Sequence, residues 1–281
     1  MLIAEPDGSL VVALRGLGPE PAAPQRLVTL GPDRDIASEV TLADLPPDAN
    51  WMKAALSADG TRIAATRLNG PISVIDRATG SEVASVDVLS AGFVGFDGPD
   101  RLLVDRGAGS FERPLSGVAQ VYALPDATQV GEASGAAAAP IFTNGIAAAI
   151  STDGTLIAQH VETARDSGVV AIRIADAAFP SWSGRLLTAP LAAWRLGRQI
   201  LPELSFSPDG RYLAASFDSP QEWGRTTSAV IVWSLATDEV VASIPTTTEW
   251  RSIAWLPDGE SLAVLRFHAD AGTGEVAVIG L

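Results

Sequence analysis

The chain has 281 residues, of which 47% are hydrophobic, and it contains no cysteine. Its 33 acidic and 19 basic side chains give a net charge of −14, which opposes binding to nucleic-acid phosphate and to anionic lipid. The lack of cysteine excludes disulfides, thiolate nucleophiles and Cys-ligated zinc. No stretch approaches the roughly 20 uninterrupted apolar residues of a membrane helix, so we expect partners that are neither nucleic acid nor membrane.

The first residues, Met1–Asp7, contain neither a basic segment nor the apolar core of a signal peptide, which favours a cytoplasmic protein. Lys53 is the one lysine, and every other basic residue is arginine. Together with the abundance of Ala, Gly and Pro, this usage suggests a GC-rich bacterial genome.

An apolar run, a turn built on Asp-Gly and a second apolar run recur along the chain. The turns contain Asp7, Asp59, Asp153, Asp209 and Asp258, with a degenerate copy that ends at Asp100. These six aspartates are separated by 52, 41, 53, 56 and 49 residues. A repeat of this size, made of short apolar strands and turns, indicates an all-β fold of the β-propeller type.

The strands expected within each repeat are short, rich in β-branched residues and bounded by turn chemistry. In chain order we expect them at 2–4, 9–14, 26–30 and 36–42; 51–56, 61–67, 72–76 and 82–86; 92–96, 101–104, 118–124 and 129–132; 145–150, 155–160, 169–174 and 185–188; 203–206, 211–216, 229–235 and 239–244; and 251–255, 261–266 and 275–279.

The predicted organisation is one propeller domain over residues 1–281 with six visible four-stranded blades, the sixth of them incomplete. The blades are expected at approximately 1–45, 50–88, 90–132, 141–189, 203–245 and 249–281. The sequence ends at Leu281, before any fourth strand of the sixth blade. Either the ring closes with a three-stranded blade, or the sequence is a piece of a longer chain and the propeller has seven blades.

The segment Ser207–Ala214, Ser-Pro-Asp-Gly-Arg-Tyr-Leu-Ala, followed by Val230–Thr237, resembles the repeats of WD-repeat proteins and their bacterial relatives. The Ser-Pro-Asp-Gly form is also similar to repeats of the Tol-system and prolyl oligopeptidase propellers. The Gly-His dipeptide of WD repeats is absent, and Trp-Asp is replaced by Trp233-Ser234. The resemblance implies a scaffold for protein or peptide interaction, usually without catalysis. No cofactor is expected, because the sequence contains no cofactor-binding motif.

Long connections are predicted at one face of the propeller, at residues 15–25, 105–117, 161–168, 217–228 and 267–274 within blades and at 133–144 and 189–202 between blades. Long loops on a rigid scaffold are where binding specificity tends to reside. Exposed tryptophan and arginine are common binding hot spots. The interaction face is therefore expected to include the following residues of the long connections: Phe111, Arg113, Trp194, Arg195, Glu222, Trp223 and Arg225. The alternative is that these side chains pack their own loops onto the blades.

Two other functional classes remain open at this stage. One is a propeller enzyme, such as a lactonase-like hydrolase with a metal in the channel, for which the inner strands offer Glu203, Glu249 and Arg251. The other is a regulatory propeller module of a larger peptidase or kinase. Catalytic and metal residues are not predicted, because the Asp-Gly turns lack the ligand run of a calcium loop and the two histidines, His160 and His268, belong to different blades.

Overall fold

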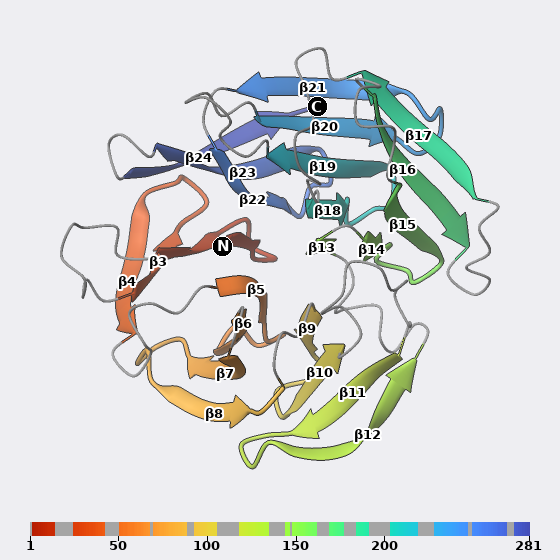
Figure 1. Cartoon of the computed structure of the whole chain (residues 1–281). Coiled ribbons are helices and arrows are strands. Elements are labelled where there is room, and N and C mark those ends of the chain that lie inside the picture. The colour runs from red at the N-terminus through yellow and green to blue at the C-terminus, as the bar shows by residue number, and fades with distance from the viewer. Residues whose placement is uncertain are drawn as a thin grey trace. The chain divides into compact units, whose positions relative to one another are not determined.

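The structure is a computed structural model, and it describes residues 2–14, 25–42, 51–67, 70–88, 93–105, 118–134, 144–146, 148–161, 169–176, 184–190, 203–218, 228–246, 249–268 and 273–281. All regular elements in these residues are β-strands, numbered β1 to β24 (Figure 1). The chain divides into two compact units, Met1–Phe142 and Thr143–Leu281. Each unit contains three antiparallel sheets, which we number 1 to 6 in chain order.

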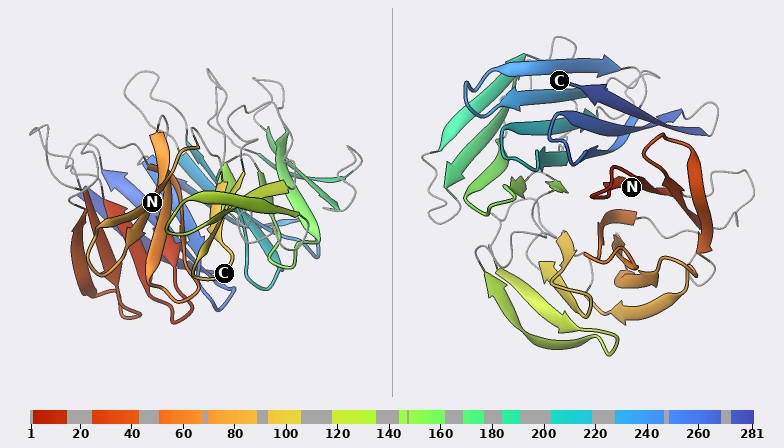
Figure 2. Two further views of the ribbon diagram at one scale, coloured as in Figure 1. Left: turned by 90° about the horizontal axis from the view of Figure 1, so that it is seen from below. Right: turned by 180° about the vertical axis from the view of Figure 1, so that it is seen from behind.

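The first unit is built of three four-stranded sheets whose strands follow one another in chain order (Figure 1 and Figure 2). Sheet 1 contains β1 (Leu2–Ala4), β2 (Leu10–Leu14), β3 (Gln25–Leu30) and β4 (Ile36–Leu42); sheet 2 contains β5 (Trp51–Leu56), β6 (Arg62–Arg67), β7 (Gly70–Asp76) and β8 (Glu82–Val86); sheet 3 contains β9 (Phe93–Phe96), β10 (Arg101–Asp105), β11 (Val118–Ala123) and β12 (Thr128–Ser134).

The second unit contains a four-stranded, a five-stranded and a three-stranded sheet. Sheet 4 contains β14 (Ala148–Ile150), β15 (Leu156–Val161), β16 (Val169–Asp176) and β17 (Arg185–Pro190); sheet 5 contains β13 (Asn144–Ile146), β18 (Glu203–Phe206), β19 (Tyr212–Asp218), β20 (Ser228–Ser234) and β21 (Val240–Thr246); sheet 6 contains β22 (Glu249–Trp255), β23 (Ser261–His268) and β24 (Thr273–Gly280).

The strands lie close to the positions predicted from the sequence, with one difference at the start of sheet 4. The prediction of a single inner strand over 145–150 is wrong. Its first part, β13, pairs with β18 of sheet 5, whereas its second part, β14, pairs with β15 of sheet 4. The inner edge of β18 presents free backbone donors and acceptors, and β13 satisfies them.

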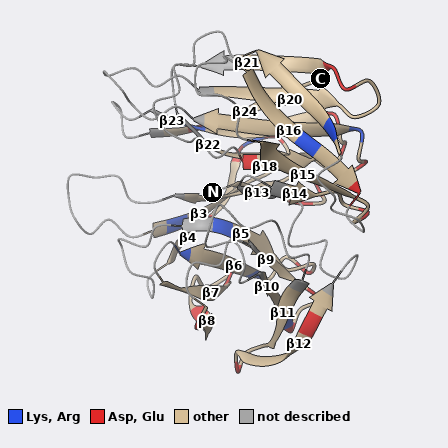
Figure 3. Ribbon diagram, turned by 45° about the vertical axis from the view of Figure 1, so that its right-hand side comes forward, with Lys and Arg blue, Asp and Glu red and all other residues tan. Residues whose placement is uncertain are grey.

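Burial along the strands reflects their position in the sheet. Charged residues are few along the strands, most of which are drawn tan in Figure 3, the colour of residues other than Lys, Arg, Asp and Glu. The third strands of sheets 2 and 5, β7 and β20, have runs of fully buried residues, whereas the fourth strand β17 alternates between exposed and buried positions. Such alternation is expected for a strand with one face on the core and one face in solvent.

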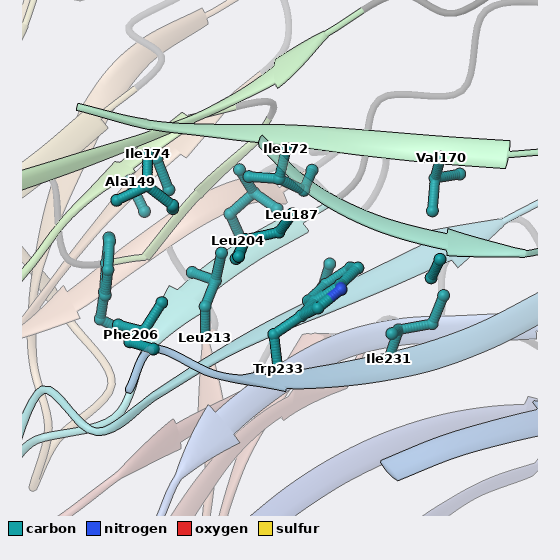
Figure 4. Close-up of a cluster of buried hydrophobic side chains, with 14 of the residues drawn as sticks. Ala149, Val170, Ile172, Ile174, Leu187, Leu204, Phe206, Leu213, Ile231 and Trp233 are labelled. Carbon is teal, nitrogen blue, oxygen red and sulfur yellow. The ribbon is translucent and has the colours of Figure 1, made fainter. Parts of the chain in front are cut away.

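Apolar side chains of consecutive sheets form the cores. One cluster joins sheets 1 and 2, and another joins sheets 2 and 3. In the second unit, one cluster joins sheets 4 and 5 and another joins sheets 5 and 6. Figure 4 shows the cluster of sheets 4 and 5, in which Trp233 of β20 lies among Leu187, Leu204 and Leu213 and is fully buried.

Candidate functional site

The two ends of each sheet carry different kinds of connection. Because neighbouring strands are antiparallel, the first-to-second and third-to-fourth connections lie at one end, which we call the turn end. The connections between second and third strands, and those that lead to the next sheet, lie at the opposite end of the sheet, which we call the loop end. All first-to-second connections have four or five residues, whereas the second-to-third connections vary from two residues (68–69) to twelve (106–117).

The residues predicted to form an interaction face belong to three connections at the loop ends. Phe111 and Arg113 lie between β10 and β11, Trp194 and Arg195 between β17 and β18, and Glu222, Trp223 and Arg225 between β19 and β20. All seven fall outside the described residues. The candidate site is therefore defined by the strand ends that carry these connections.

The connection of residues 219–227 begins and ends at strand ends that are paired and buried. Strands β19 and β20 stay paired up to the connection, where Asp218, the last residue of β19, is opposite Ser228, the first residue of β20. The adjacent pair, Phe217 and Ala229, is buried at 1% and 4% exposure. The two ends of this nine-residue connection are thus held side by side by a ladder of backbone hydrogen bonds and by the core of sheets 4 and 5.

The connection that carries Trp194 and Arg195 is anchored by the same core. Ala189 at the end of β17 and Leu204 at the start of β18 are both buried members of the cluster of sheets 4 and 5. The positions before residue 191 and after residue 202 are therefore fixed by apolar packing in the second unit. Two of the three predicted connections consequently start from strand ends that belong to one apolar cluster.

Glu203, which the sequence placed near the inner strands, makes contacts between sheets 5 and 6. Its Oε2 accepts a hydrogen bond from the backbone N–H of Ile253 at 3.2 Å, and its Oε1 lies 3.4 Å from the Ser252 hydroxyl. Glu249 and Arg251 lie on β22, but their side chains fall outside what the structure describes. The contacts of Glu203 give it a role in joining the two sheets.

The turn ends are closed by a repeated hydrogen-bond motif. In three turns a serine hydroxyl donates to the aspartate Oδ1: Ser57 to Asp59 at 2.6 Å, Ser151 to Asp153 at 2.6 Å and Ser207 to Asp209 at 2.7 Å. The same aspartate oxygen accepts the backbone N–H two residues further on, and the following glycine has a positive φ, as a turn requires. Turn formation thus accounts for the Asp-Gly repeat.

These hydrogen bonds shift the titration of the turn aspartates. The Ser57 hydroxyl, followed by the Thr61 backbone N–H, holds the pKa of the Asp59 carboxyl below its usual value. The Ser151 hydroxyl and the Thr155 backbone do the same for the pKa of Asp153. Both carboxylates are exposed, and their role is to stabilise the turn in its charged form.

Arginine residues connect the turn ends of neighbouring sheets. Arg77 donates to both carboxylate oxygens of Glu5 at 2.6 and 2.7 Å and to the Thr29 hydroxyl at 3.1 Å, which joins sheet 2 to sheet 1. Arg211 pairs with Asp209 in its own turn and with Glu260 of sheet 6 at 3.2 Å. Sequence reasoning missed these pairs, because no local pattern relates residues that are 72 or 49 positions apart.

The described residues bring together no group of three or more His, Cys, Asp or Glu side chains suited to a metal ion. His160 lies on β15 of sheet 4 and His268 on β23 of sheet 6. Trp255 of β22 is buried in the core between sheets 5 and 6: its Nε1 donates to the Ser205 carbonyl at 3.0 Å, and its ring stacks on Tyr212. Within the part of the chain described, no helix is long and apolar enough to span a membrane.

Comparison with known proteins identifies the fold. No protein-family model matches the chain, and no curated protein matches it in sequence. Among the solved structures that match is the β-propeller domain of Cps50 (Swd1) from Myceliophteria thermophila, with a TM-score of 0.55 and 13% sequence identity, covering 100% of this chain and 96% of that one. The chain is an all-β protein of the propeller fold.

Proposed function

We propose that the chain is a protein- or peptide-binding propeller that holds its partner at the loop ends of its sheets. The observation that carries this proposal is the contrast between the two ends. At the turn ends every first-to-second connection is short, and three of them are closed by the same hydrogen-bond motif, whereas the loop ends carry long connections such as 106–117, 191–202 and 219–227, the last of them on buried, paired strand ends. Variable connections on a rigid scaffold are the usual location of binding specificity.

Within the loop ends, the proposed contact residues are Phe111, Arg113, Trp194, Arg195, Glu222, Trp223 and Arg225. Tryptophan and arginine provide large contact areas and directional hydrogen bonds, and both are enriched among binding hot spots. The net charge of −14 favours a partner with a basic surface, because opposite charges accelerate encounter. The connection of residues 219–227 is the best anchored of the three, so it provides the first test.

The test compares the affinity of the full chain and of a loop variant for the same partner. Partners are first captured with the immobilised chain and identified by mass spectrometry, and the affinity of each purified partner is then measured by titration calorimetry. The variant carries Trp223→Ala and Arg225→Ala. The control carries Gln129→Ala and Val130→Ala on β12, where both side chains are exposed.

Loss of two hot-spot side chains should weaken binding at least tenfold, which corresponds to about 1.4 kcal/mol. The control variant should bind as the unaltered chain does, to within about twofold. A change below about 0.5 kcal/mol in the loop variant would show that this patch does not bind the partner.

A further inference from the structure

The six Asp-Gly bonds of the chain all lie in turns between first and second strands, but one of them is placed differently. Each turn begins at the residue whose N–H donates to the carbonyl that closes it. Five turns begin at Glu5, Ser57, Ser151, Ser207 and Leu256, and their aspartate and glycine are the third and fourth residues. In the turn between β9 and β10 the first residue is Asp97 itself, whose N–H donates to the Arg101 carbonyl at 3.0 Å.

The five regular turns engage both groups of the Asp-Gly bond in hydrogen bonds. The glycine N–H donates to the carbonyl of the first turn residue at 2.8–3.1 Å. One aspartate oxygen accepts the backbone N–H two residues further on, also at 2.8–3.1 Å. The amide nitrogen and the carboxylate of each pair are therefore held by different partners and kept away from each other.

Neither group of the Asp97-Gly98 bond is held in this way. The residue two positions after Asp97 is Pro99, which has no N–H to donate. Among the residues that the structure describes, the Gly98 N–H has no hydrogen-bond acceptor. The Asp97 carboxylate pairs with Arg101 at 2.9 Å, but the two side chains are 45% and 57% exposed, and such surface pairs are weak.

The space around Gly98 is open as well. A Cβ built on this glycine would have no heavy atom within 4 Å beyond its chain neighbours. The turn therefore leaves room for the backbone at Asp97 and Gly98 to rearrange, and glycine has the backbone freedom to do so.

An aspartate followed by glycine can react with its own backbone. The glycine nitrogen attacks the side-chain carboxyl carbon, a C–N bond forms, and the nitrogen proton leaves with a carboxyl oxygen as water. The product is a five-membered succinimide ring. Water then opens the ring, and opening at the main-chain carbonyl gives isoaspartate. The water lost in the first step is regained in the second, so the reaction is an isomerisation that needs no other reactant.

We propose that Asp97 is a modification site, at which the folded chain forms isoaspartate in preference to its other five Asp-Gly bonds. At those five, ring closure has to break the hydrogen bonds of the glycine N–H and of the carboxylate, whereas at Asp97 it breaks only an exposed ion pair. Loss of two hydrogen bonds corresponds to a rate that is at least about tenfold lower. This site lies at a turn end and is independent of binding at the loop ends.

The modification affects a contact between sheets 2 and 3. Arg62 of β6 donates to the Pro99 carbonyl at 2.7 Å and pairs with Asp100 at 3.3 Å. Isoaspartate adds a methylene group to the main chain just before Gly98, which displaces Pro99 and Asp100 from Arg62. Conversion at Asp97 thus weakens the joint between two sheets of the first unit.

The test incubates the full chain near neutral pH and locates isoaspartate in its tryptic peptides by electron-transfer fragmentation. A parallel sample is unfolded in urea, where no turn protects any Asp-Gly bond. The variant Asp97→Glu keeps the charge but would have to form a six-membered ring, which closes more slowly; Asp59→Glu is its matched control. Asn69 and Asn144, which also precede glycine, are counted separately, because their deamidation changes the mass and aspartate isomerisation does not.

In the folded chain we expect isoaspartate at Asp97 to accumulate at least about tenfold faster than at each of the other five aspartates. This preference should largely disappear in urea. Total isoaspartate, measured by methylation with an isoaspartyl methyltransferase, should decrease in Asp97→Glu and stay unchanged in Asp59→Glu. Similar rates at all six aspartates of the folded chain, or no product at Asp97, would overturn the proposal. The same preference in urea would also overturn it, because local sequence and not the fold would then set the rate.

Discussion

Replacement of Trp233 measures how strongly the core between sheets 4 and 5 holds the second unit together. The indole is fully buried, and its Nε1 donates to the Thr188 carbonyl of β17 at 3.2 Å. Trp233→Phe removes this hydrogen bond, worth about 1 kcal/mol net. It also leaves a void of roughly 40 Å³, which adds about 1 kcal/mol at about 24 cal/mol per Å³.

The expected loss in the free energy of unfolding is therefore about 2 kcal/mol for Trp233→Phe and about 3–5 kcal/mol for Trp233→Ala. Urea denaturation followed by far-ultraviolet circular dichroism measures both, because this signal does not depend on the number of tryptophans. The control is Val241→Ala on β21, where the side chain is 48% exposed and the change should stay within about 0.5 kcal/mol. If Trp233→Phe also remained within that margin, the packing described between sheets 4 and 5 would be incorrect.

Three further predictions concern the turn ends. Gly80→Ala should lower the free energy of unfolding by more than about 2 kcal/mol, since a Cβ there would lie 2.3 Å from the Thr41 carbonyl oxygen. The control is Gly98→Ala, where φ is similarly positive but no atom lies within 4 Å of the added Cβ; it should cost about 1 kcal/mol, and thermal unfolding measures both. Arg77→Gln and Glu5→Gln should show a coupling of about 1–2 kcal/mol in a double-mutant cycle, because both side chains are largely buried and their contact is bidentate; additive effects would contradict it. Asp153→Asn should reduce stability at neutral pH, because the pKa of Asp153 is lowered in the folded chain. The difference from the unaltered chain should shrink as the pH falls below the ordinary pKa of an aspartate and through the lowered native one; a difference that does not change with pH across the acid range would contradict this reasoning.

The fold was predictable from the sequence because its turns have a local chemical pattern. Aspartate, glycine and a preceding serine identify the turns at Asp59, Asp153 and Asp209, and the strands follow from the apolar runs beside them. The pairing of β13 with β18 was not predictable, because a three-residue strand has no local pattern that selects its partner sheet. The positive φ of Arg34 and Ala127 was not predictable either, because neither residue type favours that backbone conformation.

The candidate site was predictable only at the level of its position. Connection lengths follow directly from the strand boundaries, so the long connections between the second and third strands of sheets 1, 3 and 5 could be derived from the sequence. Side-chain contacts between distant residues could not, as the bridge from Glu203 to Ile253 shows. Such long-range contacts contribute to the way the sheets join.

The central claim is that partners bind at the loop ends of the sheets. Hydrogen exchange of the full chain with and without its purified partner, read by mass spectrometry, tests it most directly. The account predicts protection on binding in peptides that cover residues 106–117, 191–202 and 219–227, with little change in those that cover the turns at 57–61, 151–155 and 207–211. Protection concentrated at these turns, with none at the three long connections, would contradict it.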